Sequence, residues 1–174
     1  MPENLVRRFV DLIKGSLEEI EEIYFNLPRA SGQQQELPDV VRERVFCYEF
    51  YHQTRLSMEQ TPNHSDAESM PLIYLHGEPD KKGHIDFENE NPDFIIHIPG
   101  QTRQNILIIE VKGIIERQRH CPATNTEENE AFCDIEKILK FINRPHNKYE
   151  AGIFVVFNYS LDELRNVLAI NSQP

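Results

Sequence analysis

The chain has 174 residues, of which 27% are charged and 39% hydrophobic, and its formal net charge at pH 7 is −11. This composition is typical of a globular protein, and the length suits one domain with a core large enough to fold alone. The acidic excess argues against a surface that coats nucleic acid, because contacts with phosphates need Lys and Arg side chains. It leaves open a local basic groove and a carboxylate site that binds a metal ion.

The sequence gives no sign of a membrane or export segment. No apolar run reaches the roughly 18 residues of a membrane-spanning helix. The first residues, MPENLVRRFVDLIKG, lack both the charged-then-apolar layout and the cleavage site of a secretion signal. The three cysteines, Cys47, Cys121 and Cys133, are an odd number without paired spacing. We therefore expect no membrane partner and a reducing, cytoplasmic location.

The first part of the chain predicts two helices. Residues 4–25 carry apolar side chains at spacings of three and four, which is the period of a helix with one buried face. A polar loop follows over 26–38. Asp39 is then placed to cap a second helix over 39–57, which continues into a polar connection over 58–69.

Three strands are predicted in the middle of the chain, over 70–78, 92–100 and 105–113. The last two contain the short apolar runs FIIHI and ILII, which are typical of buried strands. A charged connection over 79–91 separates the first strand from the second.

The C-terminal part predicts a return to helical structure. We expect a stretch that is mostly loop, a helix, a strand and a last short helix, over 114–129, 130–142, 149–160 and 161–169. The element order α-α-β-β-β-α-β-α indicates a single domain over residues 1–174, of the α/β or α+β class.

The second and third strands are predicted to form an antiparallel hairpin. The loop between them, PGQTRQ, opens with Pro and Gly, which are typical of a turn. We expect Ile98 to pair with Asn105, a register that places Ile96 opposite Leu107.

The same register brings charged side chains together at one end of the sheet. Asp93 lies opposite Glu110, and Glu110 and Lys112 share one face because side chains alternate along a strand. Directly opposed residues have Cβ atoms about 5 Å apart, so the two carboxylates repel each other unless a positive group lies between them. A divalent metal ion meets that requirement, and Lys112 alone meets it only in part. The alternative is a structural cluster of ion pairs at a sheet end.

The segments PDFIIHIPG and NILIIEVKG resemble the motif of the PD-(D/E)XK nuclease superfamily: a Pro-Asp pair, a hairpin, and Glu110-Val111-Lys112. The resemblance covers about residues 40–157. It implies a restriction-endonuclease-like fold, in which helices flank a central mixed four-stranded sheet. It also implies hydrolysis of phosphodiester bonds in DNA by an endonuclease, in genome defence or repair, with Mg²⁺ as the cofactor and Mn²⁺ as a substitute.

By this resemblance, Asp93 and Glu110 are expected to bind Mg²⁺, with the carbonyl oxygen of Val111 as a further ligand. Lys112 would position or activate the attacking water, or stabilise charge on the phosphate. These roles suit the residue types, because Mg²⁺ prefers carboxylate, carbonyl and water oxygens and lowers the pKa of bound water. An ammonium group beside it stabilises developing negative charge.

The family often adds a catalytic carboxylate from the helix before the sheet. Glu49, in FCYEFYHQ, is the candidate, and Glu43, more than a turn earlier, is the weaker choice. The alternative for Glu49 is an ion pair with a neighbouring arginine.

Basic side chains near the motif are the candidates for binding substrate. Arg117 and Arg119 belong to ERQRH, the one basic stretch that follows the motif. The family can also place polar residues on the helix after the Glu-x-Lys strand, where Asp134 and Lys137 would face the substrate. The alternative is that both are solvated helix residues.

A second function stays open at this point: a catalytically silent domain of the same fold that acts as a binding or assembly module. The acidic net charge favours it. By the family resemblance, a nuclease of this size needs to dimerise to cut both strands, so we expect a homodimer or a subunit of a larger complex. The spacing of His120, Cys121 and Cys133 does not predict a zinc site.

Overall fold

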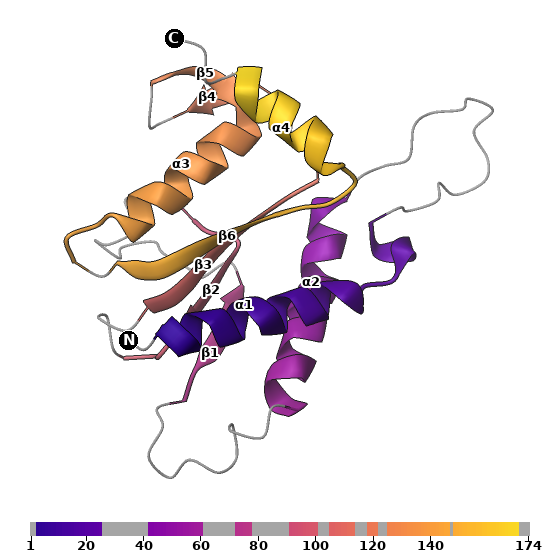
Figure 1. Cartoon of the computed structure of the whole chain (residues 1–174), viewed down its shortest axis with the longest axis vertical. Coiled ribbons are helices and arrows are strands. Elements are labelled where there is room, and N and C mark those ends of the chain that lie inside the picture. Colours follow the sequence, from indigo (N-terminus) through magenta and orange to yellow (C-terminus); the bar gives the residue numbers. More distant parts are fainter. Residues whose placement is uncertain are drawn as a thin grey trace.

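The structure, a computed structural model, describes residues 3–25, 42–60, 72–77, 91–100, 105–113, 118–121, 125–146 and 148–170. In chain order, the helices and strands (Figure 1) are α1 (Glu3–Glu18), η1 (Glu22–Tyr24), α2 (Glu43–Gln60), β1 (Tyr74–Gly77), β2 (Phe94–His97), β3 (Asn105–Lys112), β4 (Gln118–Cys121), β5 (Thr126–Asn129), α3 (Glu130–Ile142), β6 (Tyr149–Val156) and α4 (Leu161–Ile170).

Four strands form one mixed sheet in the order β1-β2-β3-β6. β1 runs antiparallel to β2, and β2 antiparallel to β3, whereas β6 lies parallel to β3. A parallel pair needs a crossover connection, and α3 follows β3 and precedes β6 in the chain. The predicted class, a mixed α/β structure with a four-stranded mixed sheet and helices, is confirmed at that level.

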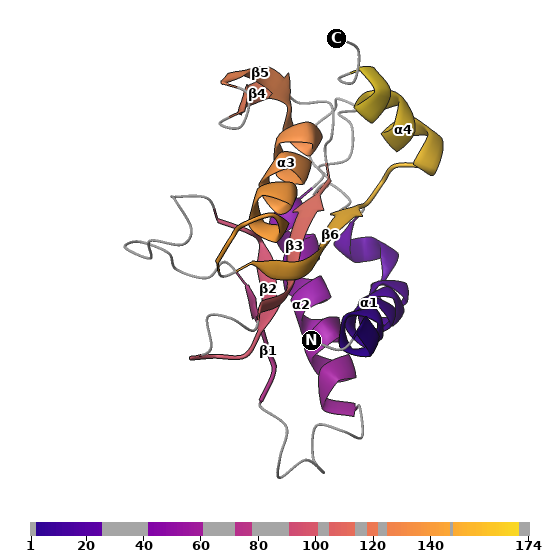
Figure 2. The same ribbon diagram turned by 60° about the vertical axis from the view of Figure 1, so that its left-hand side comes forward.

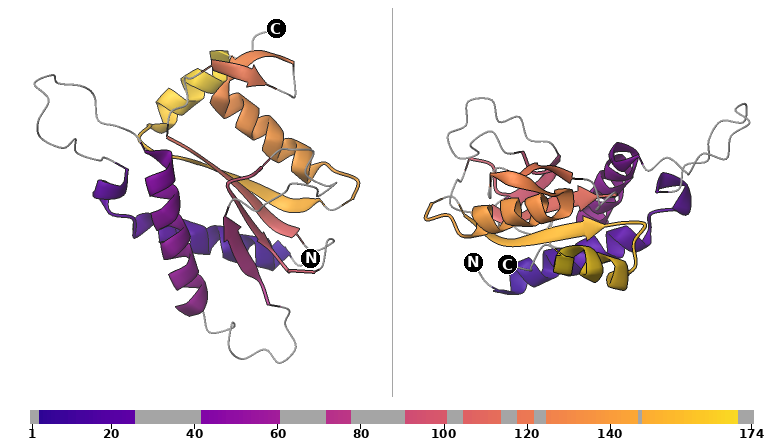
Figure 3. Two further views of the ribbon diagram at one scale, coloured as in Figure 1. Left: turned by 180° about the vertical axis from the view of Figure 1, so that it is seen from behind. Right: turned by 90° about the horizontal axis from the view of Figure 1, so that it is seen from above.

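Helices cover both faces of this sheet. α1 and α2 lie against one face and α3 against the other (Figures 1 and 2), and Figure 3 shows the same arrangement from behind and from above. The strand β3 is in consequence buried along almost its whole length. Burial on both faces explains why its sequence is a nearly unbroken apolar run.

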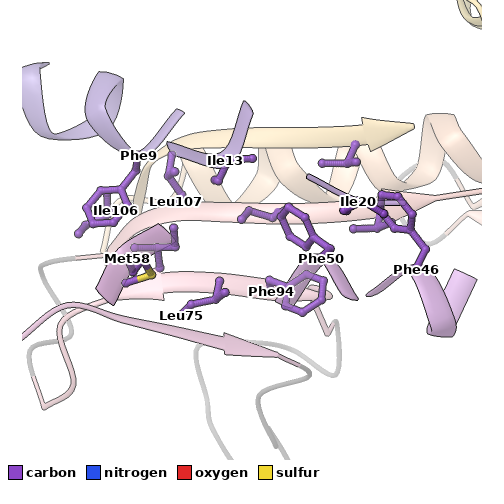
Figure 4. Close-up of a cluster of buried hydrophobic side chains, with 14 of the residues drawn as sticks. Phe9, Ile13, Ile20, Phe46, Phe50, Met58, Leu75, Phe94, Ile106 and Leu107 are labelled. Carbon is purple, nitrogen blue, oxygen red and sulfur yellow. The ribbon is translucent and has the colours of Figure 1, made fainter. Parts of the chain in front are cut away.

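The larger apolar cluster lies between the sheet and the helices α1 and α2. Phe50 of α2 meets Phe94 of β2 edge to face, with ring centroids 5.2 Å apart, and Phe46 stacks on Phe157 at 4.2 Å. Figure 4 shows how the side chains of this cluster converge from α1, α2, β1, β2, β3 and the residue Ile20 after α1. Those labelled are Phe9, Ile13, Ile20, Phe46, Phe50, Met58, Leu75, Phe94, Ile106 and Leu107.

A smaller apolar cluster joins α3 to the opposite face. Ile138 and Phe141 of α3 pack with Ile95, Ile108 and Tyr149 from three neighbouring strands. Because successive side chains of a strand point to opposite faces, this cluster identifies the face of β3 to which Glu110 and Lys112 also belong.

The register of β2 against β3 agrees with the prediction at its centre and differs at the turn. Ile96 pairs with Leu107, as predicted. Asn105 pairs with His97 rather than with the residue after it, because Ile106 is an extra residue that forms a β-bulge. The predicted pairing of Asn105 is therefore wrong by one residue, while the register toward Glu110 is unaffected.

Other predicted elements need correction. The predicted helix over 4–25 is interrupted, since α1 ends at Glu18 and η1 follows as a separate turn. The segment 114–129, predicted as mostly loop, contains the antiparallel pair β4–β5. Most of the predicted connections, and the predicted helix cap Asp39, lie outside the described residues.

No helix in the described part of the chain is long and apolar enough to cross a membrane. All three cysteines fall in described segments, and none of them forms a disulfide. Cys121 and Cys133 are buried, and Cys47 is half-buried.

The close contact between α3 and β6 depends on Gly152. A Cβ atom at this position would overlap Cγ2 of Ile138 and lie 3.1 Å from Cδ1 of Ile142. Ile138 is β-branched, so its χ1 is restricted in a helix and Cγ2 cannot swing aside. We expect Gly152→Ala to lower the free energy of unfolding by about 1–3 kcal/mol, the usual range for overpacking, as measured by urea denaturation.

The matched control for this prediction is Ile138→Ala, which removes the overlapping atom. The double variant should lose less stability than the sum of the two single losses, because each change relieves the other. Strictly additive losses would contradict the assigned contact.

Candidate functional site

The candidate site lies where β3 ends and α3 crosses it. Asp93 is the residue before β2, one step beyond the pair formed by Phe94 and Ile109. Its Oδ2 accepts a hydrogen bond of 2.7 Å from the backbone N–H of Val111. This bond holds the carboxylate beside the end of β3, next to Glu110. Burial raises the pKa of Asp93, and the hydrogen bond from Val111 opposes only part of that shift.

Glu110 is a buried carboxylate, with 2% of its surface exposed. Its Oε2 lies 2.6 Å from Nζ of Lys137. Its Oε1 is also buried and, among the described residues, has no hydrogen-bond partner. Burial raises the pKa of Glu110 well above its usual range; Lys137 counteracts part of this effect, while Asp93 and Asp134 add to it.

Lys112 faces three carboxylates. Its Nζ lies 3.1 Å from Asp134, 3.6 Å from Glu130 and 3.7 Å from Glu43. Burial alone would lower the pKa of Lys112, but these carboxylates, Asp134 first, outweigh it and raise the pKa. Lys112 therefore carries a positive charge at neutral pH.

The helix α3 supplies the partners of both strand residues. Lys137 lies 3.5 Å from Oδ1 of Asp134 and donates a hydrogen bond of 3.1 Å to the carbonyl of Asn91. The side chains of Asp134 and Lys137 are only 3% and 14% exposed. The reading of both as solvated helix residues is therefore wrong.

A sequence signal could have revealed the burial of Asp134. It falls on the buried stripe of α3, three residues after Ala131 and four before Ile138. A carboxylate within such a stripe needs a partner inside the fold, because an unpaired buried charge is costly.

The helix carboxylate that touches the site is Glu43, the first residue of α2. Its Oε2 accepts a hydrogen bond of 3.1 Å from the backbone N–H of Gly113, in addition to its contact with Lys112. Glu49 instead accepts a hydrogen bond of 2.7 Å from Gln53 on its own helix. Glu49 lies six positions after Glu43, which is about 9 Å along a helix. In the described contacts, Glu43 and not the predicted Glu49 reaches Lys112.

The predicted basic stretch lies only partly within the described residues. Arg117 lies outside the described residues. The backbone of Arg119 is in β4, opposite Glu128 in β5, and its side chain is outside the described part. Lys137, the third predicted substrate-binding residue, lies inside the charged site rather than on the solvated surface of α3.

We refer to these side chains as the charged cluster: Glu43, Asp93, Glu110, Lys112, Glu130, Asp134 and Lys137. Its five carboxylates and two ammonium groups leave an excess of three negative charges when all are ionised.

The carboxylate oxygens of this cluster are of the ligand type that hard divalent cations prefer. Within the described segments, no three His, Cys, Asp or Glu residues form a group that could hold a metal ion. The pair Asp93 and Glu110 nevertheless offers carboxylate oxygens, one of them the buried Oε1 without a hydrogen-bond partner. Mg²⁺ and Mn²⁺ are commonly bound through one or two carboxylates together with waters and substrate phosphates.

Comparison of the chain with protein-family models, with curated proteins and with solved structures finds no match.

The raised pKa of Glu110 predicts that this residue lowers stability at neutral pH. A carboxyl group whose pKa is higher in the folded than in the unfolded state disfavours folding once pH rises above its unfolded pKa of about 4.3. We expect Glu110→Gln to raise the melting temperature at pH 7, and the gain to vanish as pH falls below 4. Lys137 keeps Asp134 and the carbonyl of Asn91 as partners in this variant.

Thermal unfolding of parent and variant between pH 3.5 and 8 checks this expectation. Glu59→Gln is the matched control, because Glu59 is an exposed carboxylate paired with Arg55 on α2. A loss of stability in Glu110→Gln at pH 7 would contradict the sign derived from burial.

Proposed function

We propose that this chain is a Mg²⁺-dependent phosphodiesterase of the PD-(D/E)XK type that hydrolyses DNA. Glu110 carries the proposal: it is a buried carboxylate on a rigid central strand, beside Asp93 and Lys112, with one oxygen that has no hydrogen-bond partner among the described residues. A protein that needed only stability would lose little by replacing the buried ion pair of Glu110 and Lys137 as a whole with apolar side chains. Clusters of titratable groups with shifted pKa values are typical of functional sites.

The order of elements supports a restriction-endonuclease-like fold. The resemblance implies a helix, three strands, a helix and a further strand, and α2, β1, β2, β3, α3 and β6 follow one another in that order around the small β4–β5 pair. The motif residues stand at the same end of the hairpin β2–β3.

Asp93, Glu110 and the carbonyl of Val111 would hold the metal ion. When bound, Mg²⁺ supplies an acidified water and neutralises charge on the scissile phosphate. Asp93 is already oriented by the N–H of Val111, and Glu110 by the ammonium of Lys137. These contacts fix the positions of the oxygens before any ligand arrives, which lowers the cost of assembling the site.

Lys112 suits the role of electrostatic stabiliser better than that of general base. Three carboxylates surround its ammonium group, so it keeps its proton at neutral pH. A protonated amine cannot accept a proton from water, but it can donate hydrogen bonds to a phosphate on which negative charge develops.

DNA is the proposed substrate because of the family resemblance, and the basic residues Arg117 and Arg119 would contact its backbone. Local positive charge is enough for such contacts even in an acidic protein, since charges more than about 8–10 Å away are largely screened at physiological salt. A homodimer, or assembly with a partner subunit, would provide the second site needed to cut both strands.

One observation favours a second candidate, a catalytically silent domain of this fold that serves as a binding or assembly module. Both lysines of the charged cluster are engaged by carboxylates, Lys112 by three of them and Lys137 by two. In a silent domain the cluster would serve only to form these ion pairs, and it would need no metal ion.

Calorimetric titration of Mn²⁺ into the purified protein separates the two candidates. We expect one binding event in the parent that both Asp93→Asn and Glu110→Gln abolish, because each removes a negatively charged ligand. Glu59→Gln, the exposed carboxylate of α2, should bind as the parent does. Lys112→Ala should keep the binding event and lose cleavage of DNA by about 10²–10³-fold, as expected for the removal of one stabilising donor.

Two results would count against a metal-dependent nuclease. Cleavage that proceeds in EDTA would sink the metal-dependent mechanism. A parent that neither binds Mn²⁺ nor cuts single- or double-stranded DNA at any Mg²⁺ or Mn²⁺ concentration would favour the silent module.

A further inference from the structure

Asp134 lies between the two lysines of the charged cluster. Its Oδ2 is 3.1 Å from Nζ of Lys112, and its Oδ1 is 3.5 Å from Nζ of Lys137. The side chain is 3% exposed, so its charge is removed from solvent and needs partners inside the fold, and these two ammonium groups are among them. One lysine comes from β3 and the other from α3, so a single carboxylate ties the helix to the strand.

The other carboxylates near these lysines each serve one of them in the described contacts. Glu130 and Glu43 touch Lys112, at 3.6 Å and 3.7 Å, and Glu110 touches Lys137 at 2.6 Å. The contacts form a chain of alternating charge: Lys112, Asp134, Lys137, Glu110. Asp134 is its central link.

We propose that Asp134 is a positioning residue that holds the ammonium groups of Lys112 and Lys137 on its two oxygens, so that the site presents two cations to one phosphodiester. The inference rests on the proposed function and extends it, because it assigns the positions of Lys112 and Lys137 to one buried carboxylate.

The spacing of the ammonium groups of Lys112 and Lys137 fits this role. The two ammonium groups lie on the two oxygens of one carboxylate, in ion pairs of 3.1 Å and 3.5 Å, so they are close to each other. That spacing suits electrostatic contact of both ammonium groups with one phosphodiester. Lysine side chains are long and lose considerable freedom when fixed, so a buried carboxylate that fixes two of them before substrate arrives lowers the cost of binding the transition state.

Lys137 also orients the carboxylate of Glu110. By holding Oε2 of Glu110 it leaves Oε1 as the oxygen available to another ligand. Asp134 restrains Lys137 from the other side, and the carbonyl of Asn91 accepts its hydrogen bond at 3.1 Å. The position of Asp134 therefore affects Lys112 directly and Glu110 through Lys137.

The first test needs no activity. We would measure the melting temperatures of Lys112→Met, Lys137→Met and the double variant, in the parent and in an Asp134→Asn background. In the parent, the double change removes both ammonium groups described beside Asp134, so its loss should exceed the sum of the single losses by about 2–4 °C. In Asp134→Asn the losses should become additive, because the shared carboxylate is gone.

Glu130→Gln provides the matched background. Glu130 lies on the same helix and also contacts Lys112, at 3.6 Å, but its described ion pair does not include Lys137. The coupling between the two lysines should persist in this background. Additive losses in the parent, or coupling that persists in Asp134→Asn, would overturn the inference whether or not the protein cuts DNA.

The second test uses the reaction. If the parent cleaves DNA, Asp134→Asn should lower kcat by about 10²-fold and leave KM and the Mn²⁺ titration unchanged, because the proposed ligands Asp93 and Glu110 remain. Asp134→Glu, which restores the charge, should recover part of kcat. An unchanged kcat in Asp134→Asn would overturn the positioning role. Coupled lysines in a parent that does not cleave would instead support Asp134 and count against the proposed function.

Discussion

The burial of charge on a central strand is the constraint around which this structure is built. β3 is covered on one face by α1 and α2 and on the other by α3, and it carries Glu110 and Lys112 on the α3 face. A buried ionised group is tolerated only with a partner and hydrogen bonds of its own. The helix α3 provides those partners, Asp134 and Lys137, within one turn. The position of α3 on the sheet is thus set by charge as well as by apolar contact.

The two kinds of contact divide the length of α3. Toward its C-terminal end, Ile138 and Phe141 pack against Ile95 and Ile108. Toward its N-terminal end, Asp134 and Glu130 turn to the charged strand end. Apolar packing does not specify a unique helix rotation as sharply as paired charges do, because a mispaired charge in a dry interior is far more costly than a misplaced methyl group. The cluster therefore fixes the register of helix against strand while the apolar half supplies the driving force.

Helix ends contribute to the same cluster. Glu43 is the first residue of α2 and Glu130 the first of α3, and both carboxylates reach Lys112. The first turn of a helix favours negative charge, because its backbone N–H groups point outward and the macrodipole is positive there. Two helix N-termini thus support carboxylates beside the ammonium of Lys112. Sequence periodicity could not show this, since the choice between Glu43 and Glu49 depends on how α2 docks across the sheet.

Patterns along the chain predict part of the site, whereas contacts that depend on how helices dock on the sheet do not follow from them. Strand alternation and the apolar run of β3 were enough to put Glu110 and Lys112 on one face and Ile96 opposite Leu107. The bulge at Ile106 has no such signature, because no glycine or other turn residue marks it. The pair β4–β5 was missed because QRHC and TEEN carry mostly charged and polar side chains, with Thr126 as the one β-branched residue. The interpretation of Asp134 as a solvated helix residue fails because Asp134 lies on the buried stripe of α3.

The charge balance of the cluster links the two ligands that the proposed function requires. Five carboxylates against two ammonium groups would repel a phosphodiester as well as attract it. A divalent cation on Asp93 and Glu110 would reduce the excess from three negative charges to one. In a poorly solvated site this change would strongly reduce the electrostatic repulsion of a phosphodiester. Under the proposed function, an acidic protein would bind a polyanion in this way: the metal ion would offset the carboxylates, and the ammonium groups held by Asp134 would add positive charge beside the phosphate.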